Sequence, residues 1–211
     1  MMSSAVYYYI DQMYEDDLDQ VHAIDVLSFP HPWSVSTYRN ELHARQHSRY
    51  LVARVSAHLP KPTRTQSWLM QIVQHVVPKP PSTPASVPRD PIVGHGGIWL
   101  SLDEGHITTI AVHPDHRGRG VGELLVIGLI DQAYELGAQQ LTLEVRTSNT
   151  TAQRLYNKYG FAEHGVRPRY YTDNNEDAVI MWTENIHSIS FVQRLREMRS
   201  RLHERLRQLP Q

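Results

Sequence analysis

The stretch of sequence that decides the fold is residues 107–122, which read ITTIAVHPDHRGRGVG. Alternating β-formers predict a strand that ends at Val112, and an apolar helical pattern begins at Val121. Between them the glycines lack a Cβ, so an anion can approach the backbone N–H groups at the start of the helix, beside two arginines. We therefore expect a phosphate or pyrophosphate group to bind at Arg117, Gly118, Arg119, Gly120, Val121 and Gly122.

The spacing within this turn separates it from the common phosphate-binding motifs. Neither the dinucleotide pattern GxGxxG nor the pattern GxxxxGK(S/T) occurs here. Arg117-x-x-Gly120-x-Gly122 after a strand resembles instead the pyrophosphate-binding motif of the GNAT superfamily of acetyl-CoA-dependent N-acetyltransferases. The alternative that the residues themselves leave open is a basic turn that binds no ligand.

The composition is that of an ordinary globular protein, and it excludes several kinds of site. A chain of 211 residues can bury one sizeable core. The formal net charge of -1 gives no reason to expect binding to DNA or to a membrane surface. Without cysteine, the chain has no disulfide, thiolate zinc site or catalytic thiol. The sequence shows no signal peptide and no membrane-spanning run, and we expect a cytoplasmic protein that holds no metal.

Apolar periodicity predicts the order of strands and helices. Strands are expected over residues 6–10, 50–55, 92–100, 106–112 and 141–146, and a hairpin over 161–170 and 178–182. Helices are expected from residue 16 to before residue 29, and over 34–43, 121–136 and 150–159. Residues 101–105 are expected to form a turn. These elements would form one acetyltransferase domain over residues 1–186.

Two segments fall outside this pattern. Residues 57–91 are rich in proline and carry a short apolar stretch at helical spacing over 68–77, which predicts an inserted arm that either packs locally or docks a partner. Residues 187–211 predict an appended basic amphipathic helix. We expect this helix to pack on the domain or on a second copy in a homodimer; contact with RNA or the ribosome is the alternative. Its apolar positions are Phe191, Leu195, Met198, Leu202 and Leu206.

Acetyl transfer to an amine requires a base, and the strand over residues 141–146 offers one. Glu144 alternates with three aliphatic residues and therefore projects from the opposite face of the strand. A carboxylate in a partly desolvated cleft has a raised pKa and can accept a proton, directly or through a water. His106 begins the neighbouring strand, where it could share that water. An exposed glutamate and a surface histidine are the alternatives.

The leaving thiolate requires a proton, for which Tyr156 is the candidate. It lies on the short helix after the fifth strand. A phenol with a pKa of about 10 is protonated at neutral pH, while a thiol leaves with a pKa of about 8.5. A half-buried core tyrosine is the alternative. The carrier would be gripped by the turn, by Asn149 and by the exposed strand edge at Ile110, Ala111 and Val112, with a backbone N–H near Ile110 stabilising the oxyanion.

Longer segments resemble the RimI branch of the GNAT superfamily, the N-terminal protein acetyltransferases. They are residues 29–34 (FPHPWS), 106–112 (HITTIAV), 143–149 (LEVRTSN), 155–161 (LYNKYGF), 169–171 (RYY) and 176–178 (EDA). The resemblance implies that Glu144 is the general base, that Tyr156 is the general acid and that His106 assists. It also implies that the acceptor's first residues bind in a slot lined by Phe29, Pro30, His31, Tyr170 and Tyr171.

The resemblance further implies a GNAT fold: an α/β (α+β) domain with a mixed, mostly antiparallel sheet, strands 4 and 5 splayed to admit acetyl-CoA, and helices on both faces. The expected reaction is direct attack of a peptide α-amine on the thioester in a ternary complex, with a ribosomal protein as the leading acceptor. Deprotonation at pH 7 costs about 1.4 kcal/mol for an α-amine and about 4.6 kcal/mol for a lysine, which favours the α-amine. A small-amine (polyamine or antibiotic) acetyltransferase and a non-catalytic acyl-CoA-binding module are the alternatives.

Overall fold

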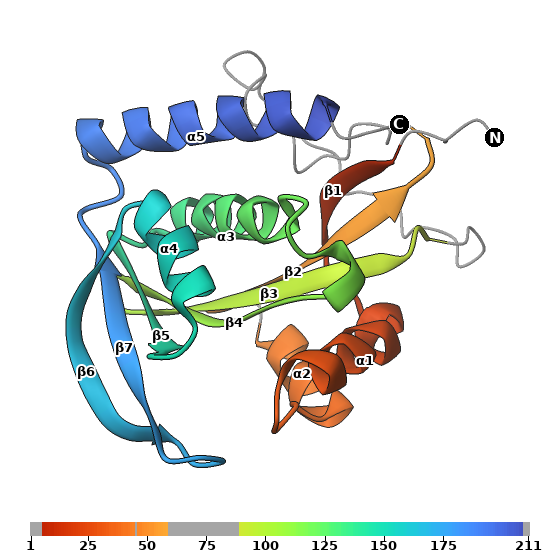
Figure 1. The fold of residues 1–211 in the computed structure, drawn as a ribbon, viewed down its shortest axis with the longest axis horizontal. Coiled ribbons are helices and arrows are strands. Elements are labelled where there is room, and N and C mark those ends of the chain that lie inside the picture. Colours follow the sequence, from red (N-terminus) through yellow and green to blue (C-terminus); the bar gives the residue numbers. More distant parts are fainter. Residues whose placement is uncertain (1–5, 45, 59–88, 209–211) are drawn as a thin grey trace.

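The chain is built on one mixed sheet of seven strands (Figure 1). The structure is a computed structural model, and it describes residues 6–44, 46–58 and 89–208. Neighbouring strands are antiparallel except β4 and β5, which run parallel. This confirms the expected mostly antiparallel α/β sheet. In spatial order the strands are β1 (Tyr7–Gln12), β2 (Ser48–Ser56), β3 (Ile92–Ser101), β4 (Glu104–Val112), β5 (Gln140–Arg146), β7 (Glu176–Thr183) and β6 (Phe161–Tyr171).

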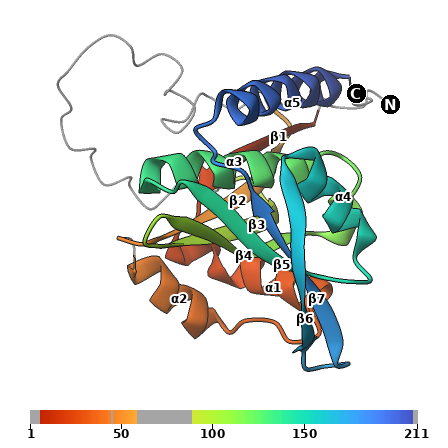
Figure 2. The ribbon, with the colours of Figure 1, turned by 90° about the vertical axis from the view of Figure 1, so that its left-hand side faces the viewer.

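Helices cover both faces of the sheet in separate layers (Figures 1 and 2). Two helices lie on one face, two on the other, and the last helix stacks on the outer side of α3. Short 3-10 turns precede α1 and α3. The helices and 3-10 turns are η1 (Glu15–Asp17), α1 (Leu18–Ser28), α2 (Val35–His43), η3 (Pro114–His116), α3 (Val121–Leu136), α4 (Thr150–Lys158) and α5 (Ile189–Arg207).

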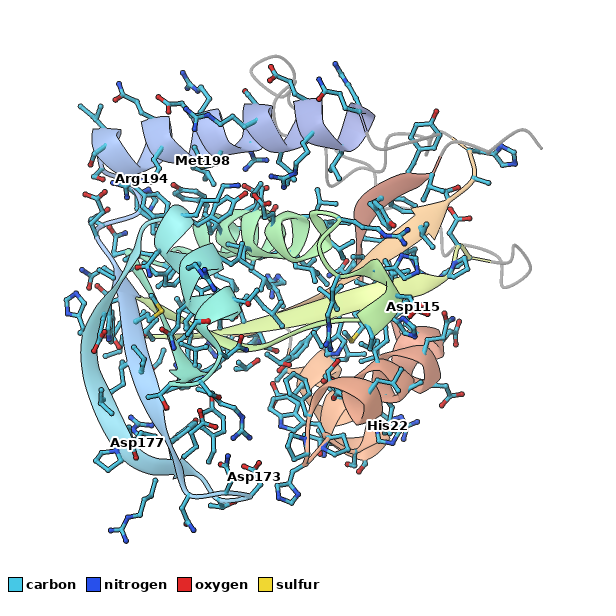
Figure 3. All side chains as sticks on the ribbon, viewed as in Figure 1. His22, Asp115, Asp173, Asp177, Arg194 and Met198 are labelled. Carbon is cyan, nitrogen blue, oxygen red and sulfur yellow. The ribbon has the colours of Figure 1, made fainter. Side chains whose placement is uncertain are left out.

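Buried apolar side chains hold these layers together. Between the sheet and α3, the fully buried Leu129 and Leu141 belong to a cluster that continues into α5 through Met198 and Leu202. Met198 lies on the side of α5 that faces α3 and α4 (Figure 3). On the opposite face of the sheet, α1 packs on β3 and β4 and α2 packs on β2, through a second cluster that includes Val21. The tail helix is therefore part of the main core of the described chain.

The connection between β3 and β4 is shorter than the sequence pattern predicts. Ser101 pairs with Glu104, so Leu102 and Asp103 alone form the turn. Leu102 is 95% exposed and takes a φ of 56 degrees. The expected turn over residues 101–105 is therefore wrong at both ends, because Ser101 belongs to β3, and Glu104 and Gly105 to β4. Glycine and glutamate are weak β-formers, and it is pairing with the neighbouring strand that makes them extended here.

A buried ion pair fixes the entry to α1. Arg54 Nη2 lies 2.7 Å from Asp17 Oδ1, and the two side chains are 1% and 3% exposed. Arg54 Nε also donates to Asp11 Oδ2 at 3.2 Å. The sequence pattern suggests that Asp17 is an ordinary acidic residue at a helix start. In the structure it belongs to η1 and ties the start of α1 to the second half of β2.

The inserted arm and its short helix, both predicted from the sequence, concern residues that the structure mostly does not describe. Most of the predicted arm over residues 57–91, including its short helix over 68–77, lies outside the described residues.

Among the described residues, no helix is long and apolar enough to cross a bilayer. In the same part of the chain there is no group of three or more His, Cys, Asp or Glu side chains that could hold a metal ion.

Candidate active site

The sheet opens between β4 and β5. Their parallel pairing covers only Glu104 to His106 on β4 and Gln140 to Thr142 on β5. Both strands continue beyond this point, and within the described chain no further pairing joins them. β4 stays paired with β3 and β5 with β7. The two strands therefore part as expected, which leaves the edge of β4 that carries Ile110, Ala111 and Val112 without a strand partner on the β5 side.

The glycine-rich turn lies at the end of this open edge, between η3 and α3. Gly118 and Gly120 take φ values of 73 and 87 degrees, in the left-handed region where a side chain is strained. Arg117 N–H donates to Pro114 O. In the described part of the chain, the following amides have no acceptor: Gly118, Arg119, Gly120, Val121 and Gly122. A run of free N–H groups at the start of a helix suits a phosphate group.

The two arginines of the turn contact protein groups on either side of it. Arg117 Nε donates to Val112 O at 3.0 Å, and its Nη2 lies 3.3 Å from Ser28 Oγ at the end of α1. Arg119 Nη1 lies 3.5 Å from the hydroxyl of Tyr8 on β1. The sequence pattern suggests that both charges lie beside the anion. The structure directs the Arg117 guanidinium to the ends of β4 and α1, a contact that depends on where α1 stops.

Asn149 caps the helix that follows β5. Its Oδ1 accepts a hydrogen bond from Ala152 N at 3.1 Å, while its amide nitrogen has no partner among the described residues. Ser148 N donates to Glu176 Oε1 at 2.8 Å, and the hydrogen bonds from Ser148 lower the pKa of Glu176 to about 2. The start of β7 therefore holds the turn that carries Asn149, just beyond the end of β5.

Glu144 and His106 face each other across the split. His106 Nε2 lies 3.1 Å from Glu144 Oε2, and the two side chains are 26% and 9% exposed. Burial lowers the pKa of His106 below its ordinary value; the negative charge of Glu144 opposes this shift. The imidazole is therefore neutral at neutral pH. Strand alternation predicts this meeting, since it places Glu144 opposite its aliphatic neighbours and His106 on the parallel strand.

Arg167 on β6 is the residue at this site that sequence reasoning missed. Its Nη1 lies 3.1 Å from Glu144 Oε1, and its side chain is 53% exposed. The guanidinium carbon also lies 5.2 Å from the centre of the Tyr170 ring. Arg167 is two residues before the RYY segment, and nothing in its own neighbourhood indicates a role. Only the hairpin of β6 with β7, and β7 with β5, carries it to Glu144.

Tyr156 lies on α4, buried beneath the same split. Its ring packs 5.8 Å from that of Phe161, centre to centre. Its hydroxyl has no hydrogen-bond partner among the described residues, although it lies close enough to Tyr171 for the two phenols to interact. Burial raises the pKa of Tyr156 above its ordinary value. The phenol is therefore protonated at neutral pH and has a free O–H to donate.

Tyr170 and Tyr171 end β6 beside Glu144. Their ring centres are 5.1 Å apart, and the Tyr171 hydroxyl donates to Glu144 O at 3.4 Å. The Arg146 guanidinium carbon lies 3.9 Å from the centre of the Tyr171 ring. Burial, and then the charge of Glu144, raises the pKa of Tyr170. The structure thus brings both tyrosines to the candidate base.

The loop between α1 and α2 approaches the tip of the β6–β7 hairpin. Phe29 is partly buried against the cluster under α1 and α2, while Pro30 and His31 are exposed. Asp173 lies at the hairpin tip (Figure 3). A hydrogen bond from Arg146 lowers the pKa of Asp173, and His31 is close enough to lower it further. The residues expected to line an acceptor slot therefore come from two segments that lie near each other.

Comparisons with known proteins agree with this geometry. The model of the acetyltransferase (GNAT) family matches residues 18–161. A Bacillus subtilis (strain 168) protein, provisionally named ribosomal protein bS18-alanine N-acetyltransferase, is 35% identical over 167 residues, which are 79% of this chain and 89% of that protein. The ribosomal protein bS18-alanine N-acetyltransferase of Escherichia coli (strain K12) is 46% identical over 82 residues, which are 38% of this chain and 55% of that protein.

A solved structure gives the same result. The crystal structure of the ribosomal-protein-S18-alanine N-acetyltransferase from Escherichia coli matches with a TM-score of 0.59 and 27% identity, and the match covers 84% of this chain and 93% of that one. The family match spans most of the chain, and it includes β4, the glycine turn, β5 and α4. The chain therefore belongs to the acetyltransferase (GNAT) family and is an N-acetyltransferase of its RimI-like branch.

Proposed function

We propose that this chain transfers the acetyl group of acetyl-CoA to the N-terminal α-amine of a protein, and that the acceptor is a ribosomal protein. The observation that carries the proposal is the Glu144–His106 pair, which lies where β4 and β5 part. The names of the relatives specify an alanine of ribosomal protein bS18, and this supports an acceptor of the same class.

The residues around the split fit the two ends of acetyl-CoA. The free N–H groups at Gly118 to Gly122 suit a diphosphate. The unpaired edge of β4 offers backbone groups to the amides of a pantetheine arm, and the free amide nitrogen of Asn149 offers one more donor. When bound, acetyl-CoA supplies the acetyl group as a thioester. A backbone N–H near Ile110 is our candidate for stabilising the oxyanion.

Glu144 would act as the general base. The amine nitrogen attacks the thioester carbon, and Glu144 accepts the proton that the nitrogen loses, directly or through one water. His106 would assist from beside the base, because its Nε2 lies 3.1 Å from Glu144 Oε2. Arg167 holds the other oxygen from an exposed position. These two neighbours place the Glu144 carboxylate beside the start of the split between β4 and β5.

Tyr156 would act as the general acid. As the C–S bond breaks, its O–H donates a proton to the departing sulfur, so that free CoA leaves as a thiol. Its hydroxyl is not engaged by any described protein group and is therefore available for this step. The phenolate then recovers a proton from solvent. Tyr170, Tyr171 and the residue 29–31 loop would bind the first residues of the acceptor peptide.

Incubation with acetyl-CoA and a peptide panel, read by mass spectrometry, tests the proposal. The panel contains a peptide that begins with the alanine of ribosomal protein bS18, the same peptide with its α-amine already blocked, and polyamines. We expect one acetyl group on the free α-amine, none on the blocked peptide and none on the polyamines. Acetylation of polyamines alone would overturn the proposed acceptor. Binding of acetyl-CoA without transfer to any amine would overturn the enzymatic role itself.

A further inference from the structure

The C-terminal end of α5 lies against the glycine turn. α5 crosses the outer side of α3 in the opposite direction, so that its last turns lie above the start of α3 (Figures 1 and 2). A Cβ placed on Gly120 would be 3.0 Å from Leu202 Cδ1, 3.2 Å from Leu206 Cδ2 and 3.3 Å from Arg205 Nη2. The tail helix thus places the Arg205 guanidinium beside Gly120, which belongs to the run of free amides that suits a phosphate group.

Glu123 holds Arg205 at this position. Glu123 is in the first turn of α3, and its Oε1 pairs with Arg205 Nη2. Its Oε2 accepts from Lys158 Nζ and, at 2.8 Å, from the Tyr159 hydroxyl. One carboxylate therefore faces two cations, and this cluster carries a net positive charge at the start of α3.

The backbone of α5 is fixed well enough to present Arg205 in one place. Arg199 makes two hydrogen bonds with Asp131 of α3, at 2.6 and 3.1 Å. Leu195, Met198 and Leu202 are buried in the main core. The side chain of Arg205, by contrast, is 46% exposed. A fixed helix with an exposed, long cationic side chain at its end is able to meet a ligand that lies on the turn.

Three other arginines of α5 pair with carboxylates away from the glycine turn. Arg194, Arg199 and Arg201 each pair with a carboxylate: Glu184, Asp131 and Glu197, respectively. Within the turn itself, the Arg117 guanidinium contacts Val112 and Ser28. Arg205 is the α5 cation that lies against the turn, because its Nη2 is among the three heavy atoms nearest to a Cβ placed on Gly120.

We propose that Arg205 binds a phosphate group of coenzyme A on the glycine turn, so that α5 forms part of the acetyl-CoA site. The inference rests on the proposed function only in taking acetyl-CoA as the ligand. Coenzyme A offers two phosphate groups of the same chemistry, the diphosphate and the 3′-phosphate. In either case the free N–H groups bind phosphate oxygens, and Arg205 adds a charged donor from α5.

Calorimetric titration of the full chain with acetyl-CoA, without any acceptor, tests this role. We expect Arg205→Gln, which keeps a hydrogen-bond donor for Glu123 but removes the charge, to weaken binding about tenfold, or about 1.4 kcal/mol. Arg205→Ala should do the same, and Arg205→Lys should recover part of the loss. The matched control is Arg201→Ala, one turn earlier on the same helix and 69% exposed, for which we expect a change of less than about twofold.

Titration with 3′-dephospho-acetyl-CoA separates the two phosphate sources. A loss that persists with this ligand assigns Arg205 to the diphosphate, and a loss that disappears assigns it to the 3′-phosphate; both results support the proposal. Urea unfolding of the same variants measures their stability and so tests the alternative, in which Arg205 only holds α5 in place through its ion pair with Glu123. Lower stability with unchanged acetyl-CoA affinity in Arg205→Gln would overturn the proposal.

The result is independent of the acceptor. If the unaltered chain binds acetyl-CoA but acetylates no peptide, the proposed function fails and the role of Arg205 is still decided by the titration. If the unaltered chain acetylates peptides and Arg205→Gln binds acetyl-CoA as tightly as it does, the inference fails alone.

Discussion

Replacement of Tyr156 by phenylalanine separates catalysis from folding at this site. The substitution removes one hydroxyl and leaves a ring that still packs 5.8 Å from Phe161. Because the hydroxyl has no hydrogen-bond partner among the described residues, folding loses no hydrogen bond. We therefore expect the free energy of unfolding to change by less than about 0.5 kcal/mol.

Turnover should fall far more than stability. Removal of a general acid costs about 100- to 10,000-fold, which is about 2.7 to 5.5 kcal/mol of the activation barrier. The phenol lies under the split and not at the glycine turn, so the affinity for acetyl-CoA should stay the same. Since burial raises the pKa of Tyr156, deprotonation of this phenol should cause no loss of kcat as the pH rises toward the ordinary tyrosine pKa of about 10.

The assay is release of free CoA thiol with a saturating N-terminal peptide, together with urea unfolding of both variants. Tyr134→Phe is the matched control, because the Tyr134 hydroxyl donates to Ile186 O at 2.5 Å, at the other end of α3. It should lose about 1 kcal/mol of stability and keep its turnover. A Tyr156→Phe chain whose kcat stays within about threefold of the original would refute the general-acid assignment.

Three further outcomes follow from the geometry. Glu144→Gln should lower kcat about 100-fold or more while calorimetric affinity for acetyl-CoA is unchanged, and retained turnover would count against the base. Because burial lowers the pKa of His106 in the folded chain, the unfolded chain binds more protons as the pH falls below about 6.5, and stability is lost there. The drop in unfolding free energy from pH 7 to pH 5 should therefore be smaller in His106→Gln than in the original chain. An equal drop in both would contradict the pKa shift. Arg54→Met should cost about 3 to 5 kcal/mol in urea unfolding, since the buried Asp17 loses its close partner and keeps only the longer pair with Arg89, at 3.6 Å. Arg39→Ala at an exposed pair should cost less than about 1 kcal/mol; equal costs would mean that the burial of the Arg54 pair has no consequence.

Local sequence pattern predicted much of the fold, because strands and helices each require apolar residues to recur at a characteristic spacing along the chain. The helix expected over residues 121–136 occurs with those bounds as α3. Alternation placed Glu144 on the face opposite Leu141, Leu143 and Val145, and the side chain is found there, at His106. The helix expected over residues 150–159 occurs as α4, and Asn149, directly before it, is its cap. Each of these predictions depends on neighbours within a few residues.

Contacts between distant segments were beyond such a pattern. The α1, α2 and β3 layer contains a buried group in which Asp25 accepts from Tyr38 and His95, both at 2.7 Å, and no local signal marks any of the three. Arg167 reaches Glu144 only through the order β5-β7-β6. Arg117 is turned toward Ser28 because α1 ends beside β4.

By itself, the sequence determined which elements form, which residues the strand and helix periods place on each face, and where a run of glycines frees backbone amides beside a helix start. The tertiary structure decided how far β4 and β5 stay paired before they part, which charges meet Glu144, and that the tail helix ends over the glycine turn. The physical reason is the distance along the chain over which each kind of interaction acts. Periodicity and turn chemistry act over a few residues, whereas hydrogen-bonded strand order and the packing of one layer on another join side chains that are far apart along the chain.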